Sequence, residues 1–114
     1  MKNYRLVFSE VDRDKFNHIA SGKKTIETRA STIKYRPIQV GDSLTFVCGK
    51  DQIIKRVKRV EHFGTLEELL ANLPLDHILP DAKDIDEVKK IYYGFTGYKA
   101  KIEANGILAF SLDS

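Results

Sequence analysis

The sequence predicts a single domain that combines α-helices with a small, mostly antiparallel β-sheet, an α+β fold. A length of 114 residues fits one domain over residues 1–114. Strand-like runs follow one another in the middle of the chain, which favours direct strand-to-strand connections. Two helix-capping patterns come after residue 63, so helices are expected to flank the sheet.

The N-terminal part predicts a strand and then a helix. Residues 4–8, Tyr-Arg-Leu-Val-Phe, form a short β-type run. Asp12 is a suitable cap for a helix through Ala20, because Phe16 and Ile19 recur at helical spacing. Gly22 is expected to end this helix in a left-handed conformation.

The next strand is predicted at residues 25–29, where polar and apolar residues alternate. Ile26 and Thr28 should face one way, and Thr25, Glu27 and Arg29 the other. The alternation is typical of a half-buried strand.

The middle of the chain predicts a loop followed by a hairpin. Residues 30–39 lack periodicity and are expected to form a loop. Strands at 43–48 and 52–63 are joined by Gly49-Lys50-Asp51, as in a hairpin connection. Ile53-Ile54 interrupts the alternation of the longer strand, which favours a β-bulge there.

The last third predicts two helices and a closing strand. Thr65 with Glu68, and Asp84 with Glu87, each match a capping pattern that precedes an apolar stripe. Pro74 should stop the first of these helices. Residues 107–112 are apolar and predict a final strand.

Composition excludes several classes of protein. No apolar run reaches the roughly 18 residues that a membrane span needs, and the N-terminus leads into no long apolar stretch. Cys48 is the only cysteine, which rules out an internal disulfide. We therefore expect a cytoplasmic protein with no membrane and no disulfide partner.

Charge is distributed unevenly along the chain. The net charge is +3, with +5 on residues 1–40, +2 on residues 41–63 and −4 on residues 64–114. A basic first half suits a phosphate-bearing partner. The alternative is that lysine and arginine simply solvate exposed faces.

Functional groups are most concentrated at residues 21–29. Lys24 and Glu27 suit general acid–base catalysis, provided that burial or neighbouring charges bring their pKa values toward neutrality. Arg29 suits bidentate binding of a phosphate or carboxyl group. The alternative is a surface strand whose charges form weak cross-strand ion pairs.

The spacing of Gly22, Lys24, Glu27 and Arg29 resembles the signature of the ASCH domain family, a branch of the PUA-like superfold. The resemblance extends in order over nearly the whole chain, through Val40-Gly41-Asp42 and the strand after it, residues 74–80, Tyr92-Tyr93, Gly97-Tyr98 and residues 106–110.

This resemblance implies a small PUA-like β-barrel with flanking helices, a cleft beside the signature, and a role with RNA or nucleosides. One bacterial branch of the family is an amidohydrolase that removes acetyl from N(4)-acetylcytidine, and another member is described as a ribonuclease. The amidohydrolase lysine falls on Lys24 and its catalytic threonine on Glu27, which would here bind substrate or direct water. The family's later catalytic glutamate has three candidates, Glu67, Glu68 and Glu87.

Further candidates complete the predicted site. Tyr35 lies in the loop and is expected to stack on a base, whereas Tyr92, Tyr93, Phe95 and Tyr98 are expected mainly to pack. The predicted ligand-binding set is Gly22, Lys23, Thr25, Arg29, Tyr35 and Arg36, and the predicted RNA-backbone contacts are Arg56, Lys58 and Arg59. His18, His62 and His77 are scattered, so neither a metal site nor a cofactor is expected.

Two functional hypotheses follow. In the first, the cleft binds RNA or a nucleoside- or nucleotide-like ligand. In the second, the protein is a small amidohydrolase acting on an acylated nucleoside, with Lys24 and Glu27 catalytic. A closed pocket beside Lys24 would favour hydrolysis, and an open basic groove past Arg56 and Lys58 would favour polymeric RNA. A domain that binds a protein partner is a third class, for which the sequence gives no positive sign.

Overall fold

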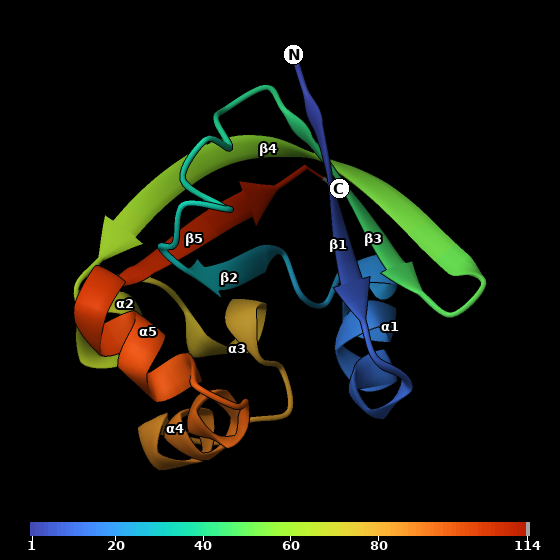
Figure 1. Ribbon diagram of the computed structural model, residues 1–114. Helices are drawn as coiled ribbons and strands as arrows, with labels where there is room; N and C mark the ends of the chain where they lie inside the picture. The colour runs from blue at the N-terminus through green and yellow to red at the C-terminus, as the bar shows by residue number, and fades with distance from the viewer. Residues whose placement is uncertain (114) are drawn as a thin grey trace.

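A curled five-stranded sheet forms the centre of the fold in the computed structural model, which describes residues 1–113 (Figure 1). Its strand order is β1-β3-β4-β5-β2. β1 runs parallel to β3 and the other three pairings are antiparallel, so the prediction of a mostly antiparallel sheet is confirmed. The strands are β1 (Asn3–Phe8), β2 (Ile26–Ala30), β3 (Ser43–Cys48), β4 (Asp51–Phe63) and β5 (Ile107–Leu112).

The sheet curls into a half-barrel whose two edges are β1 and β2. α1 lies beside β1 and β3, whereas α2 to α5 gather on the β2–β5 side (Figure 1). The helices are α1 (Arg13–Ser21), α2 (Leu66–Asn72), α3 (Leu75–Ile78), α4 (Ile85–Gly94) and α5 (Tyr98–Asn105), with a short 3₁₀ turn, η1 (Glu10–Asp12), before α1. The sequence predicts neither α3 nor α5.

The predicted helix starts after residue 63 are confirmed. The Thr65 hydroxyl accepts the Glu68 N–H at 3.1 Å, and the Asp84 carboxylate accepts the Glu87 N–H at 3.0 Å. The predicted Asp12 cap is wrong in detail, because its side chain accepts no backbone N–H of α1. Its carboxylate instead accepts from the side chains of Ser9 and Lys15.

The predicted bulge in β4 exists but lies elsewhere. The register shifts between Val57 and Arg59, where β4 leaves β3 and begins to pair with β5. Ile53 and Ile54 pair regularly with β3, and Ile54 simply points outward with 63% of its surface exposed. The extra residue therefore bends the strand where it changes partner.

Two hydrophobic cores lie on opposite faces of β5. Ile107 and Ala109 belong to the core beneath α2 to α5, whereas Leu108, Phe110 and Leu112 belong to the core beneath α1. β2 is also buried on both faces, which corrects the predicted half-buried strand. Among residues 1–113, no helix has the length and apolar character that crossing a membrane requires.

A charged triad at the edge of an aromatic cavity

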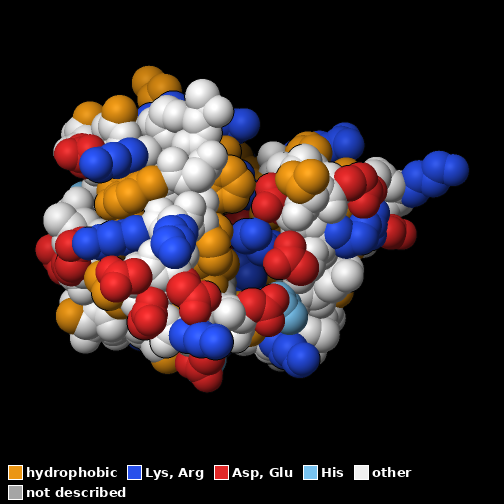
Figure 2. Space-filling model, turned by 90° about the horizontal axis from the view of Figure 1, so that it is seen from below, with side chains coloured by type: hydrophobic (Ala, Val, Ile, Leu, Met, Phe, Trp, Pro, Cys, Tyr) orange, Lys and Arg blue, Asp and Glu red, His pale blue; other side chains and the backbone are white. Residues whose placement is uncertain are grey.

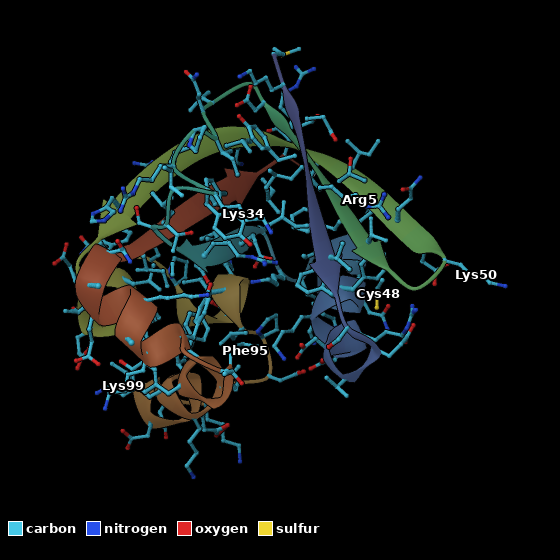
Figure 3. The ribbon with its side chains drawn as sticks, viewed as in Figure 1. Arg5, Lys34, Cys48, Lys50, Phe95 and Lys99 are labelled. Atoms are coloured by element: carbon cyan, nitrogen blue, oxygen red, sulfur yellow. The ribbon has the colours of Figure 1, made fainter. Side chains whose placement is uncertain are left out.

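A cavity of about 340 Å³ opens where the two cores meet. β2 forms its floor, the end of β1 and the start of α1 form one wall, and the helices after residue 78 form the other. Four rings line it, those of Phe8, Tyr92, Phe95 and Tyr98. Figure 3 shows Phe95 between the helical layer and α1, whereas Arg5 and Lys50 point away from this space. The volume lies at the lower end of the range for small-molecule sites.

Lys24 is buried in the floor of this cavity. It comes just after Gly22, which ends α1 at φ +84° and turns the chain into β2. Its Nζ donates to the carbonyl oxygens of Ile26 at 2.8 Å and Ile78 at 2.5 Å, and lies 3.3 Å from Glu27 Oε1. Burial lowers the pKa of Lys24 below its ordinary value, and Glu27 acts in the opposite direction. All three N–H donors of the ammonium are therefore engaged.

Glu27 is the carboxylate shared by the two cations of the floor. Its Oε2 accepts from Arg29 Nη2 at 3.0 Å, and its Oε1 accepts the Thr28 N–H at 3.1 Å. Burial alone would raise the pKa of Glu27, but Lys24, Arg29 and the Thr28 N–H outweigh it and hold the pKa below its ordinary value. The site thus contains a fixed carboxylate.

Arg29 bridges the open side of the half-barrel. Its guanidinium carbon lies 5.5 Å from the ring centroid of Phe8 and 5.5 Å from that of Tyr35, and Nη1 donates to the Tyr35 hydroxyl at 3.3 Å. Phe8 is held in turn by stacking on the fully buried Phe46. Two aromatic rings therefore help to hold the guanidinium in place through cation–π contacts.

Three hydroxyl groups line the helical side of the cavity. Thr28 Oγ1 and the Tyr92 hydroxyl form a hydrogen bond, and the Tyr98 hydroxyl accepts the Ala30 N–H at 2.9 Å. Burial raises the pKa of both tyrosines, so both hydroxyls stay protonated at neutral pH. The Tyr98 O–H can thus donate to a ligand while its oxygen accepts from β2.

The register of β2 explains why its polar groups face the cavity. The Thr25 carbonyl accepts the Leu112 N–H, and the Ser31 N–H donates to the Gly106 carbonyl. The backbone groups of the odd-numbered residues of this segment therefore form the hydrogen bonds to β5. The backbone groups of Thr28 and Ala30 therefore point toward the free edge of the sheet. This edge of β2 presents its polar groups to the cavity.

A second ion pair lies at the more exposed rim of the cavity. Lys15 Nζ lies 3.1 Å from Asp12 Oδ1 and 3.8 Å from Asp14, and the Lys15 and Asp12 side chains are each 19% exposed. A small neighbouring cavity of about 20 Å³ is bounded by Lys15, His18 and Asp81, and His18 Nε2 lies 2.9 Å from Asp81.

Lys24, Glu27 and Arg29, three of the predicted site residues, lie together in this cavity. The others lie outside its lining: Gly22, Lys23, Thr25, Tyr35, Arg36, Arg56, Lys58 and Arg59. The Tyr35 ring contacts the Arg29 guanidinium, and Arg36 holds the loop through the Ser31 carbonyl and Asn105.

None of the candidate later glutamates reaches the site. Glu67 pairs with Lys89 at 2.9 Å, and Glu68 and Glu87 lie in the first turns of α2 and α4. Among the described residues there is also no cluster of three or more His, Cys, Asp or Glu placed to hold a metal ion.

The sequence did not single out Asp12 and Lys15 as site residues, nor Thr28. The sequence gives only a weak indication of their role. Asp12 and Lys15 have the i,i+3 spacing of an ordinary helical ion pair, and the alternation of the strand predicts that Thr28 faces the same way as Ile26. The aromatic residues of 92–98 were expected mainly to pack. Tyr92 is buried and packs as expected, but it also lines the cavity together with Phe95 and Tyr98.

No family model matches the chain, and no curated protein matches it. Solved structures do. The crystal structure of the hypothetical protein PH0355 is similar to it with a TM-score of 0.84 and 28% identity, over 99% of this chain and 98% of that chain. The solution NMR structure of protein PF0455 from Pyrococcus furiosus is similar with a TM-score of 0.76 and 28% identity, over 99% and 96%. The chain is therefore similar to these proteins over its whole half-barrel and its flanking helices.

Proposed function

We propose that this chain is an ASCH domain with a PUA-like fold and that it binds a nucleoside-type ligand, free or within RNA, in the aromatic cavity. The observation that carries the proposal is the combination of four rings with a polar floor of Lys24, Glu27 and Arg29 in a space of about 340 Å³. Aromatic walls stack on bases, and convergent polar groups at one end orient a ligand.

The state of the floor favours binding over acid–base catalysis. Lys24 already donates to three acceptors, and two cations stabilise Glu27 as a carboxylate. A carboxylate with a lowered pKa is a weak base, so Glu27 is poorly suited to activate water. The spare N–H groups of Arg29 and the Tyr98 O–H can instead meet the edge of a base.

The base itself would occupy the cavity, since the predicted RNA-backbone residues are not continuous with it. Arg56, Lys58 and Arg59 are exposed on β4 and none of them lines the cavity. This arrangement favours capture of one base over a basic groove that follows a long strand.

Titration of the protein with cytidine, uridine, adenosine, guanosine and a short single-stranded RNA, followed by amide chemical shifts, tests the proposal. Residues around β2, Phe95 and Tyr98 should shift. The variant Phe95→Ala should weaken binding about fivefold to a hundredfold, the usual worth of one stacking contact. The matched control Ile54→Ala removes an exposed apolar side chain outside the cavity and should bind normally. Absence of any shift at millimolar ligand would refute the proposal.

Amidohydrolysis of an acylated nucleoside is the second candidate. One observation favours it: the Lys24 ammonium lies 3.3 Å from Glu27 in a cavity, and burial lowers its pKa. In this reaction water adds to the amide carbon, the C–N bond breaks, and the nucleoside amine leaves with a proton. Incubation with N(4)-acetylcytidine should release cytidine and acetate, and Lys24→Met should abolish release in a folded protein. If N(4)-acetylcytidine binds but no cytidine is released, the amidohydrolase proposal is refuted and the binding proposal stands.

A further inference from the structure

Two clusters of charged side chains lie along the aromatic cavity. At the floor, two cations, Lys24 and Arg29, share the single carboxylate of Glu27. At the rim, one cation, Lys15, lies within 4.0 Å of two carboxylates, Asp12 and Asp14. Figure 2 shows this face, with basic side chains in the hollow and acidic side chains beside it. The floor thus carries a formal excess of one positive charge. At the rim Asp12 balances Lys15, and Asp14, which lies outside the lining of this cavity, adds a second carboxylate near the same ammonium.

Asp12 is held in place at this rim. Its Oδ1 accepts from Lys15 Nζ at 3.1 Å, and its Oδ2 accepts from Ser9 Oγ at 3.2 Å. Both partners also line the cavity. A ligand that enters the cavity therefore passes a fixed carboxylate and a lysine whose charge is already compensated.

The floor suits an uncharged acceptor better than a phosphate. The Arg29 guanidinium makes cation–π contacts with the rings of Phe8 and Tyr35, and Glu27 and the Tyr35 hydroxyl each accept from one of its nitrogens. Lys24 has no spare donor. A phosphate there would lose its hydration among aromatic walls and gain only part of one guanidinium edge, whereas a base carbonyl loses far less.

We infer that Asp12 makes the cavity selective for uncharged nucleosides over their phosphorylated forms. This inference rests on the proposed function and specifies its ligand. The acceptor edge of the base faces Arg29 at the floor, and the sugar lies at the rim. A 5′-phosphate, or the phosphodiester of an RNA chain, would then lie beside Asp12, where the charge of Lys15 is already compensated by Asp12 and Asp14.

Calorimetric titration at low salt, with each nucleoside and its 5′-monophosphate, tests this selectivity. The nucleoside that binds should do so at least about tenfold more tightly than its monophosphate, as expected for like charges at close range. Inorganic phosphate at the same concentration should not compete with it.

The variant Asp12→Asn gives the sharper test, because it removes the charge and keeps an oxygen that can accept from Ser9. It frees Lys15 from its nearest carboxylate, so the affinity of the monophosphate relative to that of the nucleoside should rise about three- to tenfold. The control Asp113→Asn changes the net charge equally, and Asp113 does not line the cavity.

The outcomes separate the two proposals. If the monophosphate binds as tightly as the nucleoside, or inorganic phosphate competes, the selectivity is overturned while the cavity remains a nucleoside site. If Asp12→Asn leaves the ratio unchanged, Asp12 is not its source. If no nucleoside and no RNA binds, the proposed function itself is refuted.

Discussion

At the scale of single residues, the most demanding feature is the buried charge of the floor. Glu27 is 4% exposed and Lys24 is 3% exposed, and Arg29 completes the triad. Burying charges is costly unless each one is paired and hydrogen-bonded. Glu27 is the only carboxylate within 4.0 Å of either cation among the described residues, so the stability of the floor depends on it more than on either cation.

Glu27→Gln should therefore destabilise the protein more than Lys24→Met. The first change leaves two buried cations without a carboxylate and should cost about 3–5 kcal/mol of unfolding free energy. The second leaves Glu27 paired with Arg29 and should cost about 2–3 kcal/mol, chiefly from the unpaired carbonyl oxygens of Ile26 and Ile78. Urea denaturation measures both, and a larger loss for Lys24→Met would contradict this ranking.

The hydroxyl pair of Thr28 and Tyr92 should show strong coupling. Either single change, Thr28→Val or Tyr92→Phe, leaves one buried hydroxyl without its partner and should cost about 1–3 kcal/mol. The double variant removes both hydroxyls, so it should lose less than the sum of the singles. Equilibrium unfolding of the three variants and the parent protein completes this double-mutant cycle. Strictly additive losses of unfolding free energy would show that the two hydroxyls act independently.

At the scale of elements, two glycines set the chain reversals that frame the site. Gly22 ends α1 at φ +84° and ψ 1°, with open space where a Cβ would lie. Gly106 joins α5 to β5 at φ +77° and ψ −167°, and a Cβ there would lie 2.6 Å from the His62 ring and 2.7 Å from the Phe63 carbonyl. The second reversal is thus constrained by both conformation and space.

Gly22→Ala should cost about 1 kcal/mol, the price of a left-handed alanine. Gly106→Ala should cost about 3 kcal/mol or more, because its backbone region is nearly exclusive to glycine and the Phe63 backbone must also move. Thermal unfolding of the two variants gives the comparison. Equal losses would show that the close contact at Gly106 relaxes freely.

The elements also show what the sequence can predict. The capped helices and the regular strands follow from local signals, such as Thr65 and Asp84 bonding to the N–H three residues on. α5 has no such signal. Ile102 is its only buried residue, and its N-cap residue, Gly97, has no side chain that could accept a backbone N–H. α3 spans only four residues. Both helices depend on tertiary packing, which a linear pattern does not contain.

The same limit applies to the candidate site. Lys24, Glu27 and Arg29 are close in sequence, so their grouping on one short strand was predictable. The opposite wall comes from residues fifty or more positions away, such as Leu79 and Tyr98, and depends on how the helices pack against β2. Tyr35 illustrates the reverse case, since its ring covers Arg29 although its loop position suggested a ligand contact.

At the scale of the whole molecule, the triad links stability to pH. The pKa of Glu27 is lower in the folded protein than the 4.5 of a free glutamate, so the unfolded chain binds the proton more readily. The stability contributed by Glu27 is therefore fully present above about pH 4.5 and is lost as the pH falls through the folded pKa. Urea denaturation between pH 7 and pH 3 should show this loss. Glu27→Gln should be less sensitive to acid over the same range, and an identical acid dependence would contradict the assignment.

β5 places alternate side chains in both hydrophobic cores, and this has a consequence for how the protein is made. The core beneath α2 to α5 cannot close until synthesis has reached Ala109, and the core beneath α1 cannot close until it has reached Leu112. A growing polypeptide that ends before Gly106 should therefore remain unfolded at the ribosome, however good its earlier helices and hairpin are, and should acquire its structure in one late step.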